Sequence, residues 1–207
     1  YFSDPQVLKT IAKAKQIYDK TIDLPRESRA QIAVFVSGKA WFHHDAVIAP
    51  PIYHNIIRGM MYEQLPKIGA PYDTYRLEDL ADPRVRDKYK LFIFINAFTL
   101  NKSEREAIRS LKDKTTLWFY ASGYVDPQTG LSTDHISQLV GMNITKRDVK
   151  EHMQYNITNA NHPITRGIEM GTKLGITPYG YVISNELHPP AFGPVFQVDD
   201  PSAVVLA

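Results

Sequence analysis

The sequence of 207 residues contains no cysteine. This absence excludes disulfide bonds, thiolate metal sites and a cysteine nucleophile, although it leaves the redox compartment open. Long apolar runs are absent as well, so no segment has the length that a membrane span needs. With hydrophobic residues at 43% and charged residues at 22%, the composition is that of an ordinary globular domain.

An excess of either charge is also absent. Lysine and arginine together number 24 and the acidic residues 22, and the two signs are dispersed without a basic stripe. Phosphate neutralisation and binding to an anionic membrane both depend on such a stripe. We therefore expect neither nucleic acid nor a membrane as a partner.

The N-terminal segment has the spacing of an amphipathic helix over residues 4–22, with Asp4 suited to the N-cap and Pro5 to the first turn. The chain begins at Tyr1, and residues 202–207 have a strand-like pattern. We expect a fragment of a longer polypeptide. No linker composition divides it, so we expect one domain over residues 1–207, with residues 1–25 as a lead-in helix.

Four segments have the residue types of β-strands: 32–36, 72–77, 91–95 and 115–120. The first and third are unbroken apolar runs, typical of strands covered on both faces of a parallel sheet, whereas residues 72–77 alternate as an edge strand does. Helical patterns cover residues 52–68, 103–112 and 133–140. Ser103 with Glu106 predicts a capping box, and Gly141 a C-terminal stop. This alternation predicts an α/β fold with a doubly wound, mostly parallel sheet.

The end of the chain has a different pattern from the rest. Beyond residue 143 the apolar runs shorten to residues 181–183 and 195–198, and glycine, proline and asparagine become frequent. This pattern indicates antiparallel or edge structure.

Functional side chains are densest after the first strand, where Trp41, Phe42, His43 and His44 follow one another. In an open α/β sheet, ligands bind beyond the carboxyl ends of the strands. The loop lacks the glycines of a phosphate-binding turn, and adjacent histidines diverge without a second ligand pair nearby, so we expect no cofactor and no metal. We interpret Trp41 and Phe42 as a contact surface for a neighbouring domain or subunit, with sugar stacking on Trp41 as the alternative.

The turn after the fourth strand is where a hydrolase or amidotransferase of this architecture holds its nucleophile. That turn is cramped and needs small neighbours, yet Ser122 is flanked by Tyr120 and Tyr124 at two positions on either side. We interpret Ser122 as structural. A serine hydrolase stays open as a remote alternative. Its candidate bases are His135, His152, His162 and His188.

Three stretches together are similar to a known family: residues 68–75 (IGAPYDTY), 89–98 (YKLFIFINAF) and 117–124 (LWFYASGY). They resemble the amidotransferase-like domain of β-galactosidase-type glycoside hydrolases, the family-42 enzymes and their relatives. The resemblance implies a flavodoxin-like, class I glutamine amidotransferase-like fold, which in that family follows a catalytic (β/α)8 barrel and contributes to trimer assembly. It covers most of the chain, most strongly residues 4–141.

The resemblance also implies what the domain lacks. Aligned on the amidotransferase pattern G-x-C-x-G, Ala121 stands at the place of the cysteine and Phe119 replaces the first glycine, which excludes amidotransferase activity. The catalytic glutamates of the family would lie in the barrel. We therefore expect a non-catalytic accessory or oligomerisation domain, with the barrel of the same polypeptide and further copies of the chain as partners. A carbohydrate-binding domain that stacks sugars on Trp41, Tyr124 or Tyr179 stays open as the alternative.

Overall fold

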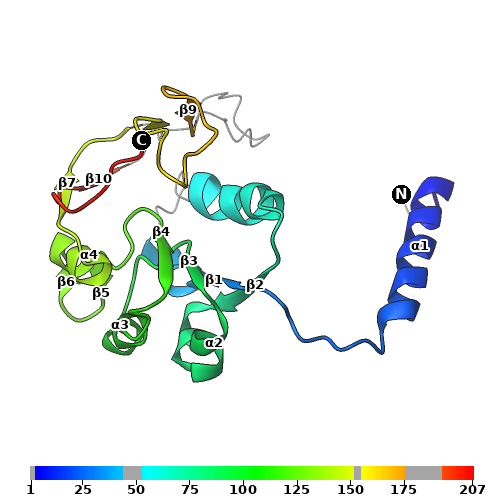
Figure 1. The fold of residues 1–207 in the computed structure, drawn as a ribbon. Helices are drawn as coiled ribbons and strands as arrows, with labels where there is room; N and C mark the ends of the chain where they lie inside the picture. The colour runs from blue at the N-terminus through cyan, green and yellow to red at the C-terminus, as the bar shows by residue number, and fades with distance from the viewer. Residues whose placement is uncertain (1–2, 44–52, 152–154, 176–192) are drawn as a thin grey trace.

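The computed structural model describes residues 3–43, 53–151, 155–175 and 193–207. Figure 1 labels the α-helices and strands where there is room, and η marks a 3-10 or π helix in the text. The elements in chain order are α1 (Pro5–Thr21), β1 (Ile32–Val36), η1 (Lys39–His43), η2 (Tyr53–Gln64), η3 (Leu65–Lys67), β2 (Tyr72–Arg76), η4 (Leu77–Ala81), α2 (Pro83–Lys88), β3 (Leu91–Phe94), α3 (Lys102–Arg109), β4 (Thr115–Trp118), β5 (Val125–Asp126), β6 (Gly130–Leu131), α4 (Thr133–Val140), β7 (Ile144–Arg147), β8 (Tyr155–Asn156), β9 (Lys173–Leu174) and β10 (Val195–Val198).

Four parallel strands form the central sheet in the order β2-β1-β3-β4. Helices α2 and α3 cover one face and η2 the other (Figure 1). The chain runs from β1 outward to β2 on one side and to β3 and β4 on the other, so the switch point lies between β1 and β3. The predicted doubly wound α/β sheet is confirmed, with the two unbroken apolar runs as its inner strands.

Aromatic rings from all four strands form a continuous row on the face that α2 and α3 cover. Phe35 stacks on Tyr75 with ring centroids 5.8 Å apart and on Phe94 at 5.3 Å. Phe94 stacks in turn on Trp118 at 4.2 Å. These residues are also register partners across the sheet. A slip of one residue in any strand would move its ring to the opposite face, so the row specifies the register.

The opposite face has a smaller core. Val34, Ile93 and Ile95 pack there against Ile57 of η2 and Leu65 of η3. A helix was expected over residues 52–68, and the chain is helical from 53 to 67. It is not a regular α-helix, because η2 has the wider π winding and the last turn is 3-10 around Pro66, which has no N–H to donate.

The predicted capping box of α3 is wrong by two residues. Asn101 is the N-cap, its Oδ1 accepting from the Glu104 amide at 2.9 Å, while Glu104 Oε2 accepts from the Asn101 amide at 2.8 Å. Ser103 lies inside the helix and donates to Asn101 Oδ1. Asparagine caps as well as serine does, so the pattern N-x-x-E competes with S-x-x-E in this sequence.

Helix α2 was not predicted, because residues 84–90 are mostly polar. The helix nevertheless begins with residues typical of a helix N-terminus: Asp82 is the N-cap and accepts from the Arg84 amide, and Pro83 follows it. With six residues the helix is too short to show a repeating stripe, and Val85 is its buried residue.

The segment beyond residue 143 adds short antiparallel pairs at the side of the sheet. β7 pairs with β10 and β8 with β9, so the antiparallel prediction is confirmed for residues 195–198. Residues 181–183 lie outside the described residues. No strand is formed over residues 203–207, although Leu206 O accepts from the Thr158 amide at 2.9 Å.

Helix α1 matches its prediction, with Asp4 accepting from the amides of Gln6 and Val7. It stands away from the body of the protein, at the end of an extended segment (Figure 1). All of Pro5–Thr21 is described, and none of its residues is buried. Within the described residues, no helix combines the length and apolar character that crossing a bilayer requires.

Arg105 of α3 ties this helix to the turn after β4. Its buried guanidinium donates to the carbonyl oxygens of Gly123 at 2.8 Å, Leu100 at 3.2 Å and His135 at 3.3 Å. Asp126 lies 3.4 Å from Nε and balances the charge. A single side chain thus satisfies carbonyls from several segments.

We expect Arg105→Lys to lower the free energy of unfolding by about 2–3 kcal/mol, because an ammonium cannot reach these carbonyls together and leaves some unpaired. Urea denaturation measures the change. Arg109→Lys on the exposed side of the same helix is the matched control and should stay within about 0.5 kcal/mol of the parent. Equal effects of the two substitutions would contradict this role of Arg105.

Candidate functional site

The carboxyl edge of the sheet is where a ligand would bind in this fold. At the switch point, the Ser37 amide donates to Asn96 Oδ1 at 2.7 Å, and Asn96 Nδ2 donates to Ser37 O at 2.9 Å. Both residues are buried. Asn96 therefore bridges β1 and β3 at the point where a ligand would enter between them.

A charged group lies beside this bridge. Lys39 Nζ is 2.7 Å from Glu104 Oε1 and 3.6 Å from Glu78 Oε1. The hydrogen bond and charge of Glu104 raise the pKa of Lys39 in spite of its partial burial. Because Glu104 Oε2 also accepts from the Asn101 amide, both of its oxygens are engaged. A carboxylate held in this way is poorly placed to act as a general base.

The turn after β4 does not bring the predicted hydrolase residues together. Ser122 is 1% exposed and its Oγ lies 3.0 Å from Phe119 O, to which it donates. His135 is bonded elsewhere, with Nε2 at 3.1 Å from Thr129 Oγ1. His162 accepts from the Ile164 amide, and His152 and His188 lie outside the described residues. No group of three or more His, Asp or Glu in the described part of the chain is placed to hold a metal ion.

The contact residues expected after β1 are described only in part. Phe42, in η1, is 88% exposed. Trp41 and His43 belong to the same helix, but their side chains lie outside the description, as does all of His44. The interface assigned to these residues stays a prediction.

Tyr124, a candidate ligand contact, is half-buried, and its ring meets Phe196 of β10 with centroids 4.9 Å apart. Tyr120 also contacts Phe196, at 5.4 Å, and its hydroxyl donates to Pro194 O at 2.8 Å. Sequence reasoning missed this aromatic group, because Phe196 lies far along the chain and no local pattern links it to the turn. Tyr179 lies outside the described residues.

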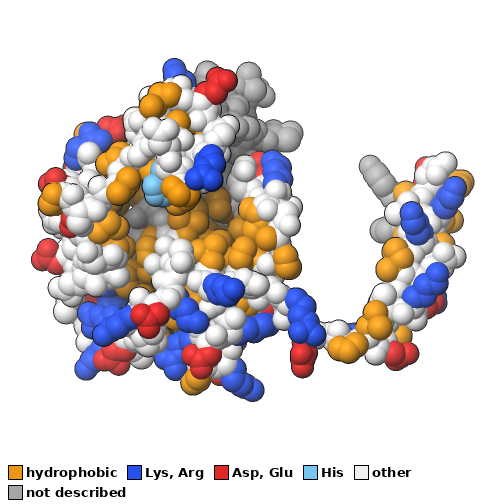
Figure 2. All heavy atoms as spheres, viewed as in Figure 1, with side chains coloured by type: hydrophobic (Ala, Val, Ile, Leu, Met, Phe, Trp, Pro, Cys, Tyr) orange, Lys and Arg blue, Asp and Glu red, His pale blue; other side chains and the backbone are white. Residues whose placement is uncertain are grey.

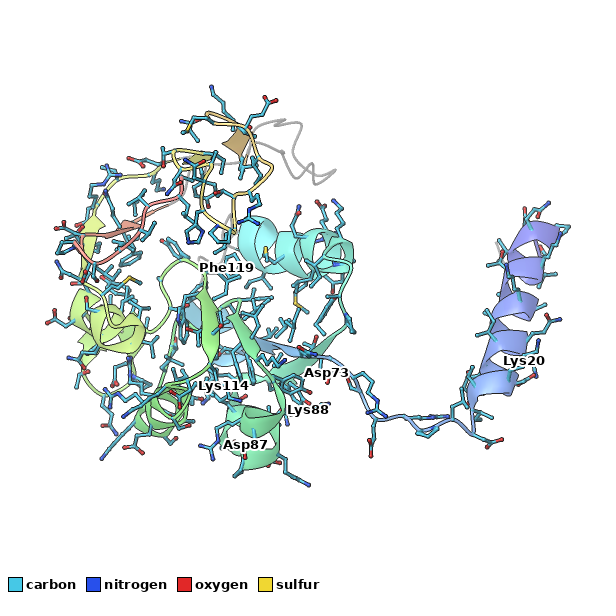
Figure 3. All side chains as sticks on the ribbon, viewed as in Figure 1. Lys20, Asp73, Asp87, Lys88, Lys114 and Phe119 are labelled. Atoms are coloured by element: carbon cyan, nitrogen blue, oxygen red, sulfur yellow. The ribbon has the colours of Figure 1, made fainter. Side chains whose placement is uncertain are left out.

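The amino edge of the sheet carries a second polar network. Asp73 accepts from Ser28 Oγ at 2.6 Å, from Lys88 Nζ at 3.0 Å and from the Tyr89 hydroxyl. Asp73 and Lys88 lie together at this end, as do Lys114 and the start of β4, while Phe119 lies at the other end of β4 (Figure 3). Tyr75 and Tyr89 hydroxyls are 2.6 Å apart. This network fastens the segment before β1 to the sheet, far from the edge that binds ligands in such folds.

Burial alone would raise the pKa of the Asp73 carboxyl, but the hydrogen bonds from Ser28, Tyr89 and Lys88 outweigh it and lower the pKa below its ordinary value. A carboxyl whose pKa is lower in the folded state stabilises the protein at pH values above its unfolded-state pKa of about 3.9. This stabilisation is lost as the pH falls through the folded-state pKa. We expect Asp73→Asn to be less stable than the parent at pH 7, and the difference to shrink below about pH 4.

Chemical denaturation at pH 7 and pH 3 measures the two differences. The exposed Asp87→Asn, from the nearby α2, is the control and should show a small, pH-independent change. A difference for Asp73→Asn that is the same at both pH values would contradict the role of the carboxylate.

The chain is similar to two solved β-galactosidase structures. No protein-family model matches this chain, and no curated protein is significantly similar to it. Among solved structures, a β-galactosidase from Bifidobacterium adolescentis is similar with a TM-score of 0.41 and 14% identity, over 55% of this chain and 53% of that chain. Gan42B, a GH42 β-galactosidase, is similar with a TM-score of 0.46 and 15% identity, over 73% of this chain and 22% of that chain.

Both structures are β-galactosidases, the class of enzyme that the sequence resemblance names. The chain spans about half of the first and about a fifth of the second.

Proposed function

We propose that this chain is a non-catalytic accessory domain of a β-galactosidase-like glycoside hydrolase, and that α1 packs on the catalytic barrel of the same polypeptide. The exposed apolar stripe of α1 carries this proposal. The parent enzyme and its barrel come from the sequence resemblance, and the stripe supplies the surface that such a neighbour would cover.

The stripe runs the length of α1. Val7, Ile11, Tyr18 and Ile22 recur at intervals of four and seven residues, which places them on one face of the helix, and each is between 39% and 55% exposed. Apolar side chains are visible along α1 in Figure 2, with lysines beside them. A single helix of this length is marginal in water, because most helical stability comes from packing an apolar face. The helix therefore needs a neighbouring surface, and the described part of this chain leaves none of its residues buried.

The carboxyl edge supports a non-catalytic role. The buried Ser122 hydroxyl donates to a backbone carbonyl and Glu104 is paired on both oxygens. A nucleophile and a base would have to meet within hydrogen-bond reach there, and Ser122 and His135 instead bond to other groups. Phe42, fully presented to solvent, supports contact with a neighbouring subunit in a homo-oligomer.

We expect Ile11→Glu in the full-length polypeptide to lower the free energy of unfolding by about 2 kcal/mol or more, because it places a carboxylate in an apolar contact. Lys13→Glu introduces the same group on the opposite side of the helix and is the control, expected to have little effect. Thermal unfolding and hydrolysis of a nitrophenyl β-galactoside are measured for both variants. Hydrolysis by the 207-residue chain alone, or equal effects of the two substitutions, would refute the proposal.

The carbohydrate-binding alternative is tested separately. We expect no heat of binding when galactose or lactose is titrated into the 207-residue chain, because the Tyr124 ring already packs on Phe196. Saturable heat that Tyr124→Ala abolishes and Phe42→Ala leaves unchanged would favour a sugar site instead.

A further inference from the structure

The turn after β4 contains an unusual backbone conformation. Tyr120 has a φ of +52°, and it is the one non-glycine residue with a positive φ among the described residues. This conformation costs an L-residue about 1 kcal/mol or more and persists only where the surroundings impose it. In enzymes that use a strand-to-helix turn to hold a nucleophile, the nucleophile is the strained residue.

Contacts on both sides impose the turn. The Gly123 amide donates to Ala97 O at 2.7 Å, and the Tyr124 amide donates to Ala121 O at 3.0 Å. Gly123 itself has a φ of +78°, and a Cβ there would lie 2.9 Å from Leu139 Cδ2 of α4. The backbone of the turn is therefore confined between the end of β3 and α4.

Of the three residues at the apex, Tyr120 is the least buried. Ala121 is 5% exposed and Ser122 is 1% exposed, whereas Tyr120 is half-buried. The alignment on the amidotransferase pattern places Ala121 at the nucleophile position. Backbone strain and exposure both indicate Tyr120 instead.

The Tyr120 side chain is held by residues distant in sequence. Its ring meets Phe98 edge-on at 5.8 Å and Phe196 at 5.4 Å. Its hydroxyl donates to Pro194 O at 2.8 Å, immediately before β10. Burial, followed by the neighbouring Tyr124, raises the pKa of Tyr120 to about 12, so the hydroxyl remains a donor at neutral pH.

We propose that Tyr120 occupies the nucleophile position of this turn and acts there as a latch, which holds residues 194–198 over the carboxyl edge of the sheet. The strained backbone directs the ring toward Phe98 and Phe196, as it would direct a reactive side chain toward a substrate. Phe98 and Phe196 take the space that a substrate would need. The latch does not depend on the parent enzyme proposed above.

The absence of cysteine allows a direct test of the position. Tyr120→Cys, Ala121→Cys and Ser122→Cys each carry a single thiol, and circular dichroism verifies that each is folded. We expect 5,5′-dithiobis(2-nitrobenzoic acid) to modify the thiol at position 120 about tenfold faster or more than the others, because exposure governs thiol reactivity. Equal rates, or a faster reaction at position 121, would overturn the assignment.

The latch itself is tested by hydrogen exchange of the peptide that covers residues 194–200. We expect exchange there to be about tenfold faster in Tyr120→Ala, and faster to a smaller degree in Tyr120→Phe, which keeps the ring but loses the bond to Pro194 O. Tyr155→Phe, in the exposed β8, is the control and should leave the peptide unchanged. Unchanged exchange in both Tyr120 variants would overturn the latch, and Tyr120→Phe answers the question even if the alanine variant does not fold.

Discussion

The row of four stacked rings across the sheet is the constraint on which the rest of the structure depends. Tyr75, Phe35, Phe94 and Trp118 contribute one ring per strand at matched register positions. Each such contact is worth about 0.5–1.5 kcal/mol beyond its buried area. Because the rings align the strands, they also align the strand ends. The positions of Asn96, Lys39 and the turn after β4 follow from that alignment.

Polar side chains have different roles at the amino and carboxyl edges of the sheet. At the amino edge, Asp73 accepts from three donors in two segments, Ser28 in one and Lys88 and Tyr89 in the other, and so fastens the chain that leads into β1. At the carboxyl edge, where folds of this type bind ligands, Asn96 pairs with the Ser37 backbone, Lys39 pairs with Glu104, and aromatic rings lie beyond the turn after β4. An edge occupied by its own side chains agrees with a domain whose contacts lie on its outer surfaces, such as α1 and Phe42.

Much of the fold could be predicted because its signals are local. The apolar runs of β1 and β3, the cap of α1 at Asp4 and the stop of α4 at Gly141 are read from neighbouring residues. The cap of α3 was misplaced because two competing cap patterns overlap there. The strained backbone at Tyr120 could not be predicted, since tyrosine has no preference for positive φ and the contacts that confine the turn, from Ala97 and Leu139 to Gly123, are distant in sequence. The side chains of Trp41 and His43 are not described, so the interface predicted from them rests on the exposure of Phe42.

The attachment of α1 has a mechanical consequence. The segment that follows it enters β1, an inner strand with a neighbour on either side. A pull on α1 along the strand direction would first break the hydrogen bond between Ser28 and Asp73. It would then shear two ladders of backbone hydrogen bonds at once, one between β1 and β2 and one between β1 and β3. If α1 were joined to an edge strand, the same pull would act on one ladder of hydrogen bonds only.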